Sequence, residues 1–251
     1  MRQAVASLGT MDGPTAGEAH GPTASVDPLR SRENIVRDAL VVVLAFVSGS
    51  TDALGFVRLG NVFTSVMTGN LVLLGVAAGR REAALALHTG DAFVGFVAGA
   101  LLGARLAGRP VRGQPMWPRA VSRALALELA AFVFVAVWWE AVGGHPTAHT
   151  TYVLLAVNAA ALGMQSSAIL RFGVSGLSST YLTGTLTTFV ASLANRSDSF
   201  PRRSFALLIA VVTGAALGAV LTVEVPRAAP LVPVVLLLAV LASARRSLAP
   251  S

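Results

Sequence analysis

Long apolar segments, separated by short polar stretches, make up the chain from residue 39 onward. They run continuously apolar, whereas the strands of a membrane β-barrel alternate apolar and polar residues. A helix needs about 20 mostly apolar residues to cross a bilayer. The pattern therefore predicts an all-α, polytopic membrane helix bundle in contact with the lipid bilayer. The eight segments cover residues 39–56, 62–78, 89–107, 121–142, 152–170, 177–194, 204–223 and 231–244.

Composition supports this class of protein and excludes others. Apolar residues make up 54% of the chain and charged residues only 12%, whereas a soluble domain is about a quarter charged. All 19 basic residues are arginines, and most lie between the apolar segments. Nucleic-acid binding requires a continuous basic surface. The net charge of +7 therefore indicates membrane topology rather than a nucleic-acid partner.

The first 34 residues differ from the rest of the chain. They are rich in Gly, Pro, Ala, Ser and Thr and contain no apolar run of the kind that a secretory signal needs. We expect residues 1–34 to form a disordered cytoplasmic tail. Residues 35–251 then form the membrane domain.

An internal repeat is visible when the chain is compared with itself at an offset of about 115 residues. Thr68-Gly69 then aligns with Thr183-Gly184, and six of the eight residues in 97–104 are identical to their counterparts in 212–219. One offset serves both matches, which predicts two related halves. Repeat one covers about residues 36–142 and repeat two about residues 150–246. Many transporter folds are built from such repeats.

The positions of the arginines favour six membrane-spanning helices over eight. Segments 62–78 and 177–194 are short and contain many hydroxyl groups and glycines. If all eight segments span, eleven arginines lie on the inner side and eight outside. If the two short segments are broken or re-entrant, the counts become fifteen and four. The positive-inside rule favours this second arrangement, with both termini cytoplasmic and the two halves inverted relative to each other.

The polar residues of the first two segments carry a family resemblance. A Gly–x–x–Asp–Ala element is followed by Gly–x–Val–Phe and then by Met-Thr-Gly-Asn. This pattern resembles the YoaK-like, or DUF1275, family of bacterial membrane proteins, over about residues 36–246. The resemblance implies a multi-pass protein of the bacterial inner membrane and implies little about activity. The matching residues are Gly49, Asp52, Ala53, Gly60, Val62, Phe63, Met67, Thr68, Gly69 and Asn70.

Asp52 is the first candidate for a functional residue, because a carboxylate inside a membrane span is costly and usually functional. It is either a proton or cation coupling site, or a residue that caps the second segment or pairs with Arg58. The hydroxyl and amide side chains are either ligands or interhelical hydrogen-bond partners. Ser167 and Thr185 stand where Asp52 and Asn70 would repeat. The candidates for substrate or ion binding are Asp52, Ser65, Thr68, Gly69, Asn70, Gln165, Ser167, Thr180, Thr183, Gly184 and Thr185.

Other residues have mainly structural interpretations. Glu128 is expected to pair with Arg123 or to act as a second carboxylate. Glycines at intervals of four let helices pack closely, with a homodimer face as the alternative. His145 and His149 are too few ligands for a metal site. The packing glycines are Gly95, Gly99, Gly103, Gly214 and Gly218.

The resulting functional hypothesis is a small-solute secondary transporter or permease, proton-coupled through Asp52. The alternative is a non-transporting structural or accessory membrane protein. The sequence contains no nucleophile motif, phosphate-binding loop or metal-binding pattern, so neither an enzyme nor a cofactor is expected. A transporter should place Asp52, Asn70, Thr183 and Thr185 around one cavity. The identity of the solute does not follow from the sequence.

Overall fold

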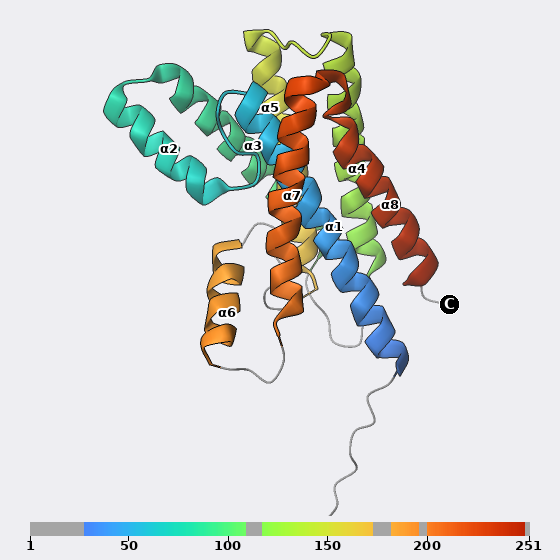
Figure 1. Ribbon diagram of the computed structural model, residues 1–251. Coiled ribbons are helices and arrows are strands. Elements are labelled where there is room, and N and C mark those ends of the chain that lie inside the picture. The colour runs from blue at the N-terminus through green and yellow to red at the C-terminus, as the bar shows by residue number, and fades with distance from the viewer. Residues whose placement is uncertain (1–27, 109–116, 173–181, 196–199, 249–251) are drawn as a thin grey trace, which may run out of the picture.

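The computed structural model describes residues 28–108, 117–172, 182–195 and 200–248, which form helices joined by turns and loops and contain no β-strand (Figure 1). Helix α1 begins at Pro28, before the tail boundary predicted at residue 35. The prediction for residues 1–27 lies outside the described residues. The helices are α1 (Pro28–Arg58), α2 (Met67–Arg80), α3 (Ala83–Ala107), α4 (Arg119–Ala141), α5 (Ala148–Leu170), α6 (Leu182–Ala194), α7 (Arg202–Glu224), the 3-10 helix η1 (Pro226–Ala228) and α8 (Leu231–Ser247).

Six of these helices are long and apolar enough to cross a membrane: α1, α3, α4, α5, α7 and α8. The two short segments form α2, with 14 residues, and α6, with 13. At 1.5 Å per residue each is about 20 Å long, which is less than the roughly 30 Å hydrocarbon thickness. The prediction of six long spans and two short segments is therefore confirmed for the described residues.

The directions of the six long helices alternate. One buried cluster contains the first halves of α1 and α4 and the second half of α5. A second cluster contains the second halves of α1 and α4 and the first halves of α3 and α5. We call the end of the bundle with the first cluster the near end, because α1 begins there, and the other the far end. Helix α2 lies at the far end and α6 at the near end (Figure 1).

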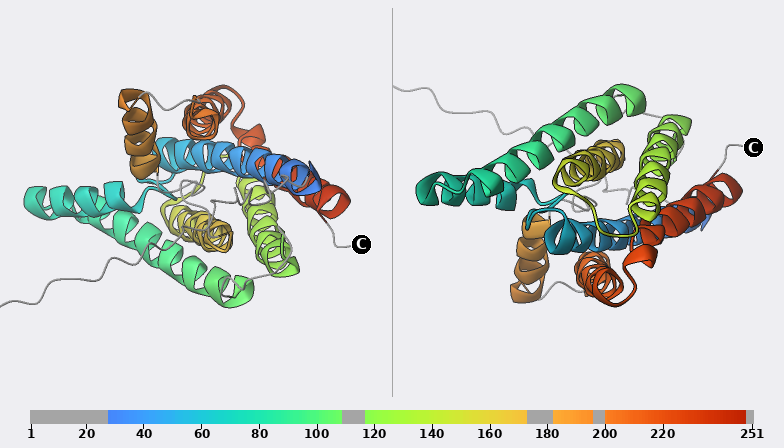
Figure 2. Two further views of the ribbon diagram at one scale, coloured as in Figure 1. Left: turned by 90° about the horizontal axis from the view of Figure 1, so that it is seen from below. Right: turned by 90° about the horizontal axis from the view of Figure 1, so that it is seen from above.

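Glycines bring two pairs of helices into backbone contact. Gly95, Gly99 and Gly103 of α3 face the backbone of Ala156, Ala160 and Met164 of α5. In the same way, Gly214 and Gly218 of α7 face Phe46 and Ser50 of α1. In both pairs the contacting residue numbers rise together, so the two helices of each pair run parallel. Since α1 and α5 run in opposite directions, the α1/α7 pair is inverted relative to the α3/α5 pair. The views along the bundle in Figure 2 show α1 beside α7 and α3 beside α5.

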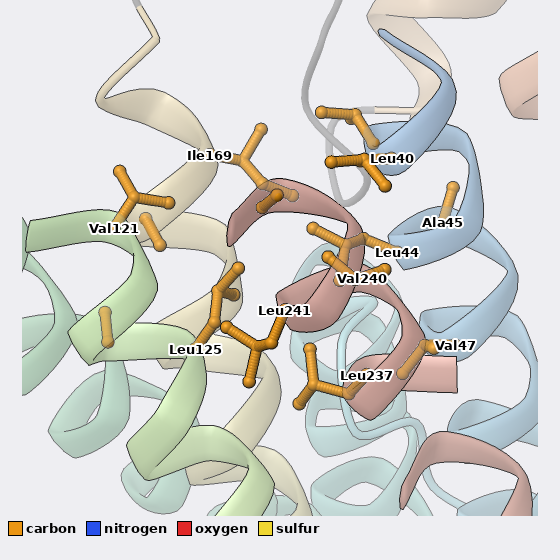
Figure 3. Close-up of a cluster of buried hydrophobic side chains, with 14 of the residues drawn as sticks. Leu40, Leu44, Ala45, Val47, Val121, Leu125, Ile169, Leu237, Val240 and Leu241 are labelled. Carbon is orange, nitrogen blue, oxygen red and sulfur yellow. The ribbon is translucent and has the colours of Figure 1, made fainter. Parts of the chain in front are cut away.

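The near end holds the larger apolar core. Leu40 and Leu44 of α1, Leu125 of α4, and Leu237 and Leu241 of α8 point toward one another there (Figure 3). At the far end the Trp139 ring is fully buried, and its Nε1–H donates to the Pro226 carbonyl at 2.8 Å. These contacts join α4 and α8 to the two glycine-packed pairs and close the bundle on one side.

Candidate functional site

The residues of the family motif meet at the far end, where the chain passes from α1 to α2. Asp52 lies in the second half of α1 and is buried. Its Oδ1 accepts hydrogen bonds from the Thr64 N–H at 2.7 Å, the Thr64 Oγ1 at 2.9 Å and the Ser65 N–H at 2.7 Å. Its Oδ2 accepts one from the Ser65 Oγ at 2.5 Å. A single carboxylate thus satisfies four donors of the segment that precedes α2.

Asn70 holds the same segment from the other side. Its Nδ2 donates to the Phe63 carbonyl at 2.6 Å, and its Oδ1 accepts from the Phe63 N–H at 3.0 Å. Asn70 is fully buried in the first turn of α2. Its amide therefore pairs with the backbone of Phe63 in the way that a neighbouring strand would.

The two polar motif residues thus have one shared effect, which is to fix residues 63–65. This short stretch is not helical, so its buried backbone groups need partners from outside a helix. Asp52 holds the stretch ahead of α2 and does not cap the helix itself, because the N-cap is Val66 and has no side-chain hydrogen bond. Arg58 does not pair with Asp52; its guanidinium donates instead to the Thr222 carbonyl of α7.

Two motif glycines meet aromatic rings. Gly60 has a φ of +103°, which a residue with a Cβ rarely adopts, and a Cβ there would also press on the His88 ring. That ring stacks on Tyr152 of α5 with centroids 4.5 Å apart. A Cβ on Gly69 would lie 3.4 Å from the Phe63 ring, at the edge of ordinary contact. The motif thus also sets how closely residues 60–70 approach α3 and α5.

The candidates of the second half do not join this group. Helix α2 packs on α3, whereas α6 packs on α7, and the two short helices lie at opposite ends of the bundle (Figure 1). Thr68 and Thr183 are exposed, Gly69 and Gly184 are partly buried, and Thr185 is buried. Thr180 lies outside the described residues. The expectation of one cavity formed by Asp52, Asn70, Thr183 and Thr185 is therefore wrong.

Polar side chains also occur where α1 meets α5. The buried Gln165 of α5 donates through Nε2 to the Ser48 Oγ at 2.8 Å and to the Leu44 carbonyl at 3.2 Å. Ser167 turns the other way and donates to the Ala100 carbonyl of α3 at 2.7 Å. Gln165 and Ser48 therefore connect the two inverted helix pairs, while Ser167 acts within one of them.

The environment of Glu128 of α4 differs from the one that the sequence predicted. Its expected pairing with Arg123 is wrong, because the Glu128 side chain is fully buried, neither carboxyl oxygen has a hydrogen-bond partner, and Arg123 is exposed. A charged residue four or five positions away on a helix is only a usable partner if both side chains lie on one face. The inward face of α4 is otherwise apolar, and the sequence signal for this was the spacing of Glu128 from Leu125 and Phe132.

Replacing Glu128 by Leu should raise the free energy of unfolding by about 1–3 kcal/mol. The change removes a buried polar group without a partner and keeps the volume of the side chain roughly constant. Thermal unfolding in detergent micelles measures the effect. Glu140→Leu is the matched control on the same helix, because Glu140 is exposed and should change stability by less than about 0.5 kcal/mol. A loss of stability in Glu128→Leu would show that the carboxyl has a stabilising partner.

A groove at the far end adjoins the motif segment. It has a volume of about 850 Å³ and is bordered by Phe56, Asn61, Leu73 and His88. Arg80 and Glu82 at its rim pair with each other at 2.7 Å. Among the described residues, no three His, Cys, Asp or Glu side chains group closely enough to hold a metal ion.

Together these features define a multi-pass helical membrane protein. A profile of the family described as "Protein of unknown function (DUF1275)" matches residues 40–243, and the chain belongs to this family. The chain is similar to the UPF0700 transmembrane protein YoaK of Bacillus subtilis (strain 168), with 34% identity over 160 residues, which is 64% of this chain and 68% of that protein. No solved structure matches the chain.

Proposed function

We propose that this protein is a secondary transporter of a small polar solute in the bacterial cytoplasmic membrane. The observation that carries the proposal is the inversion of the α1/α7 pair relative to the α3/α5 pair. Transporters of many folds consist of two inverted halves that move against each other around a site near the middle of the membrane. Parallel helix pairs held by backbone contacts are suited to move as rigid units.

The contacts within each pair support an internal repeat. Gly49 of α1 faces the Val211 carbonyl of α7, and Gly163 of α5 faces the Phe96 carbonyl of α3. Gly163 lies 114 residues after Gly49, and Val211 lies 115 residues after Phe96. The two contacts therefore join equivalent positions of the two halves. The contacts of Gly99 and Gly214 obey the same two offsets. The proposed repeat therefore describes which backbones touch, as well as which residues are identical.

The arginines support an orientation with the near end in the cytoplasm. Eleven described arginines lie toward the near end and four toward the far end, and positive charge marks the cytoplasmic side. Both described ends of the chain would then be cytoplasmic. The near-end set is Arg30, Arg32, Arg37, Arg105, Arg119, Arg123, Arg171, Arg202, Arg203, Arg245 and Arg246; the far-end set is Arg58, Arg80, Arg81 and Arg227.

The α1/α5 contact is the proposed pathway, because it is where the two inverted pairs meet. Ser48 and Gln165 present a hydroxyl and an amide there, which suits a polar solute without net charge. Asp52 takes the role of an anchor in this proposal, since donors from residues 64 and 65 occupy both of its oxygens. Coupling through Asp52 would require it to release this segment during each cycle.

Cross-linking tests the proposal directly, because the chain contains no Cys. In proteoliposomes, uptake of a panel of radiolabelled amino acids, sugars and nucleosides identifies a carried solute. Joining Ser48→Cys to Gln165→Cys with a short bifunctional thiol reagent should then reduce its uptake at least tenfold, reversibly. The matched control joins Asp38→Cys to Arg203→Cys within the α1/α7 pair, where the native residues already form an ion pair, and should leave uptake unchanged.

A non-transporting accessory role is the second candidate. It is favoured by the dense hydrogen bonding of Asp52 and Asn70, which form a packed turn rather than a cavity. If no member of the solute panel enters the vesicles faster than into protein-free vesicles, the accessory role is preferred. Equal uptake with and without the Ser48–Gln165 cross-link would place the pathway elsewhere.

A further inference from the structure

Glu128 combines a position in the middle part of a membrane-length helix with complete burial. It lies about 13 Å along α4 from Arg119 and about 20 Å from Ala141, at 1.5 Å per residue. Its side chain has no exposed surface, and both carboxyl oxygens lack a hydrogen-bond partner. Asp52, by comparison, has a donor on each oxygen.

The face of α4 around Glu128 is apolar. Ala124, Leu125 and Phe132 lie one turn away on the same face of α4, and all three belong to the near-end cluster. Opposite them the cluster continues with Leu162 of α5 and Leu237 of α8. Figure 3 shows Leu125 and Leu237 pointing into this interior. The carboxyl group therefore interrupts a stripe that would otherwise be a uniform core.

No charged residue of the neighbouring helices is paired with Glu128. Helices α3, α5 and α8 pack against α4, and no ion pair of the described residues includes Glu128. Most charged or titratable residues on these four helices are exposed, and His88, Asp91 and Tyr152 belong to the far halves of α3 and α5. Arg171, after α5, donates through Nε to the Ala107 carbonyl. The exposed residues are Arg105, Arg119, Arg123, Glu140, His149, Arg245 and Arg246.

An ionised carboxylate in this position would lack both water and a counter-charge. The neutral acid is much less costly there, because an unpaired charge in an apolar interior is far more unfavourable than an unpaired polar group. The ionised form becomes acceptable only when water reaches the group. A closed near-end cluster would thus favour the protonated form of Glu128, and an open one the ionised form.

We propose that Glu128 is a proton-binding site that loads when the bundle closes around it and releases its proton when the near-end cluster opens to water. In the release step the O–H bond of the carboxyl group breaks, its electron pair stays on the carboxylate oxygen, and the proton passes to a water molecule. This inference rests on the proposed transport function for its use, and it names the proton as the coupling ion.

Infrared difference spectroscopy of the full chain in liposomes tests the proton site without any solute. Between neutral and alkaline pH, the wild type should lose a C=O stretching band of a neutral carboxylic acid. This band should be absent in Glu128→Gln and fully retained in Glu140→Gln, the exposed control on the same helix. If Glu128→Gln does not fold, Glu128→Asp should retain the band at a shifted frequency. A band that persists unchanged in Glu128→Gln overturns the proposal, as does the lack of any such band in the folded wild type.

Uptake assays separate the failure of this site from the failure of the transport function. With a carried solute, an imposed pH gradient should stimulate uptake in the wild type at least tenfold, and Glu128→Gln should lose this stimulation while keeping solute exchange across the membrane. Stimulation that survives in Glu128→Gln overturns the coupling role. If no solute of the panel is carried and the infrared band still titrates, the proton site stands and the transport function is the part that fails.

Discussion

Replacing Asp52 by Asn should lower the free energy of unfolding by about 1–3 kcal/mol. The carboxylate accepts four hydrogen bonds, three on Oδ1 and one on Oδ2, from the backbone and side chains of Thr64 and Ser65. The Asn oxygen can keep the three donors of Oδ1, but its NH2 group then faces the Ser65 hydroxyl, and all four contacts lose the contribution of a charged acceptor. Thermal unfolding in micelles measures the loss, and faster hydrogen exchange at residues 64 and 65 locates it.

Thr68→Val is the matched control, since Thr68 lies in the same motif but is exposed. It should change stability by less than about 0.5 kcal/mol. If Asp52→Asn is as stable as the wild type but loses pH-dependent uptake, Asp52 is a coupling residue and the anchoring role is wrong. If it is unstable and the surviving folded fraction still responds to pH, the anchor is separate from coupling.

Gly99→Ala should destabilise the bundle by about 3 kcal/mol or more. A Cβ at this position would overlap the carbonyl oxygen of Ala160, which belongs to the backbone of α5 and cannot rotate away. Overpacking of a core usually costs 1–3 kcal/mol, and backbone-to-backbone overlap lies at or above the upper end of that range. The α3/α5 pair would have to separate along its length, because Gly95 and Gly103 make contacts of the same kind.

Gly90→Ala provides the comparison within the same helix. A Cβ at Gly90 has no neighbour within 4 Å, so the substitution should be neutral or stabilise α3 by up to about 1 kcal/mol through helix propensity. Unfolding in micelles, followed by circular dichroism, compares the two variants. Equal stability of Gly90→Ala and Gly99→Ala would contradict the close packing of α3 on α5.

The two halves of the bundle differ where they carry polar residues. In the first half, Asp52 and Asn70 fix the turn before α2 through side-chain bonds to the backbone of residues 63–65. In the second half, the position of Asp52 is taken by Ser167 at an offset of 115 residues, or by Ser166 at the offset of 114 residues that relates α5 to α1. The position of Asn70 is taken by Thr185. Neither replacement carries a carboxylate. A carboxylate anchor is therefore specific to the first half of the sequence.

The packing glycines of α3 and α7 contact helices of their own chain, which bears on their alternative interpretation as a homodimer face. Gly95, Gly99 and Gly103 face α5, and Gly214 and Gly218 face α1, all within one chain. These surfaces are thus occupied, because a stripe that packs against its own chain is not free for a second copy. A homodimer would need another face, such as the exposed apolar sides of α2 and α6.

The sequence alone predicted the membrane class and the family and favoured six spans over eight, because these depend on local composition. An apolar run of sufficient length becomes a spanning helix whatever its neighbours, and arginines between such runs report topology without tertiary contacts. Length and composition also distinguish the short segments 62–78 and 177–194 from the six longer ones. It also made Asp52 and the motif around Asn70 visible as unusual polar residues in an apolar chain.

Only the tertiary structure decided what those polar residues touch. That Asp52 serves the Thr64–Ser65 backbone, that Gln165 reaches Ser48, and that Glu128 has no partner all depend on which helix faces approach each other. Helix directions, offsets of a single residue and rotations about helix axes set these contacts, and none of them is encoded in hydropathy. Local composition therefore predicts how many helices are long enough to span, while long-range packing determines which carboxyl group is an anchor and which is buried alone.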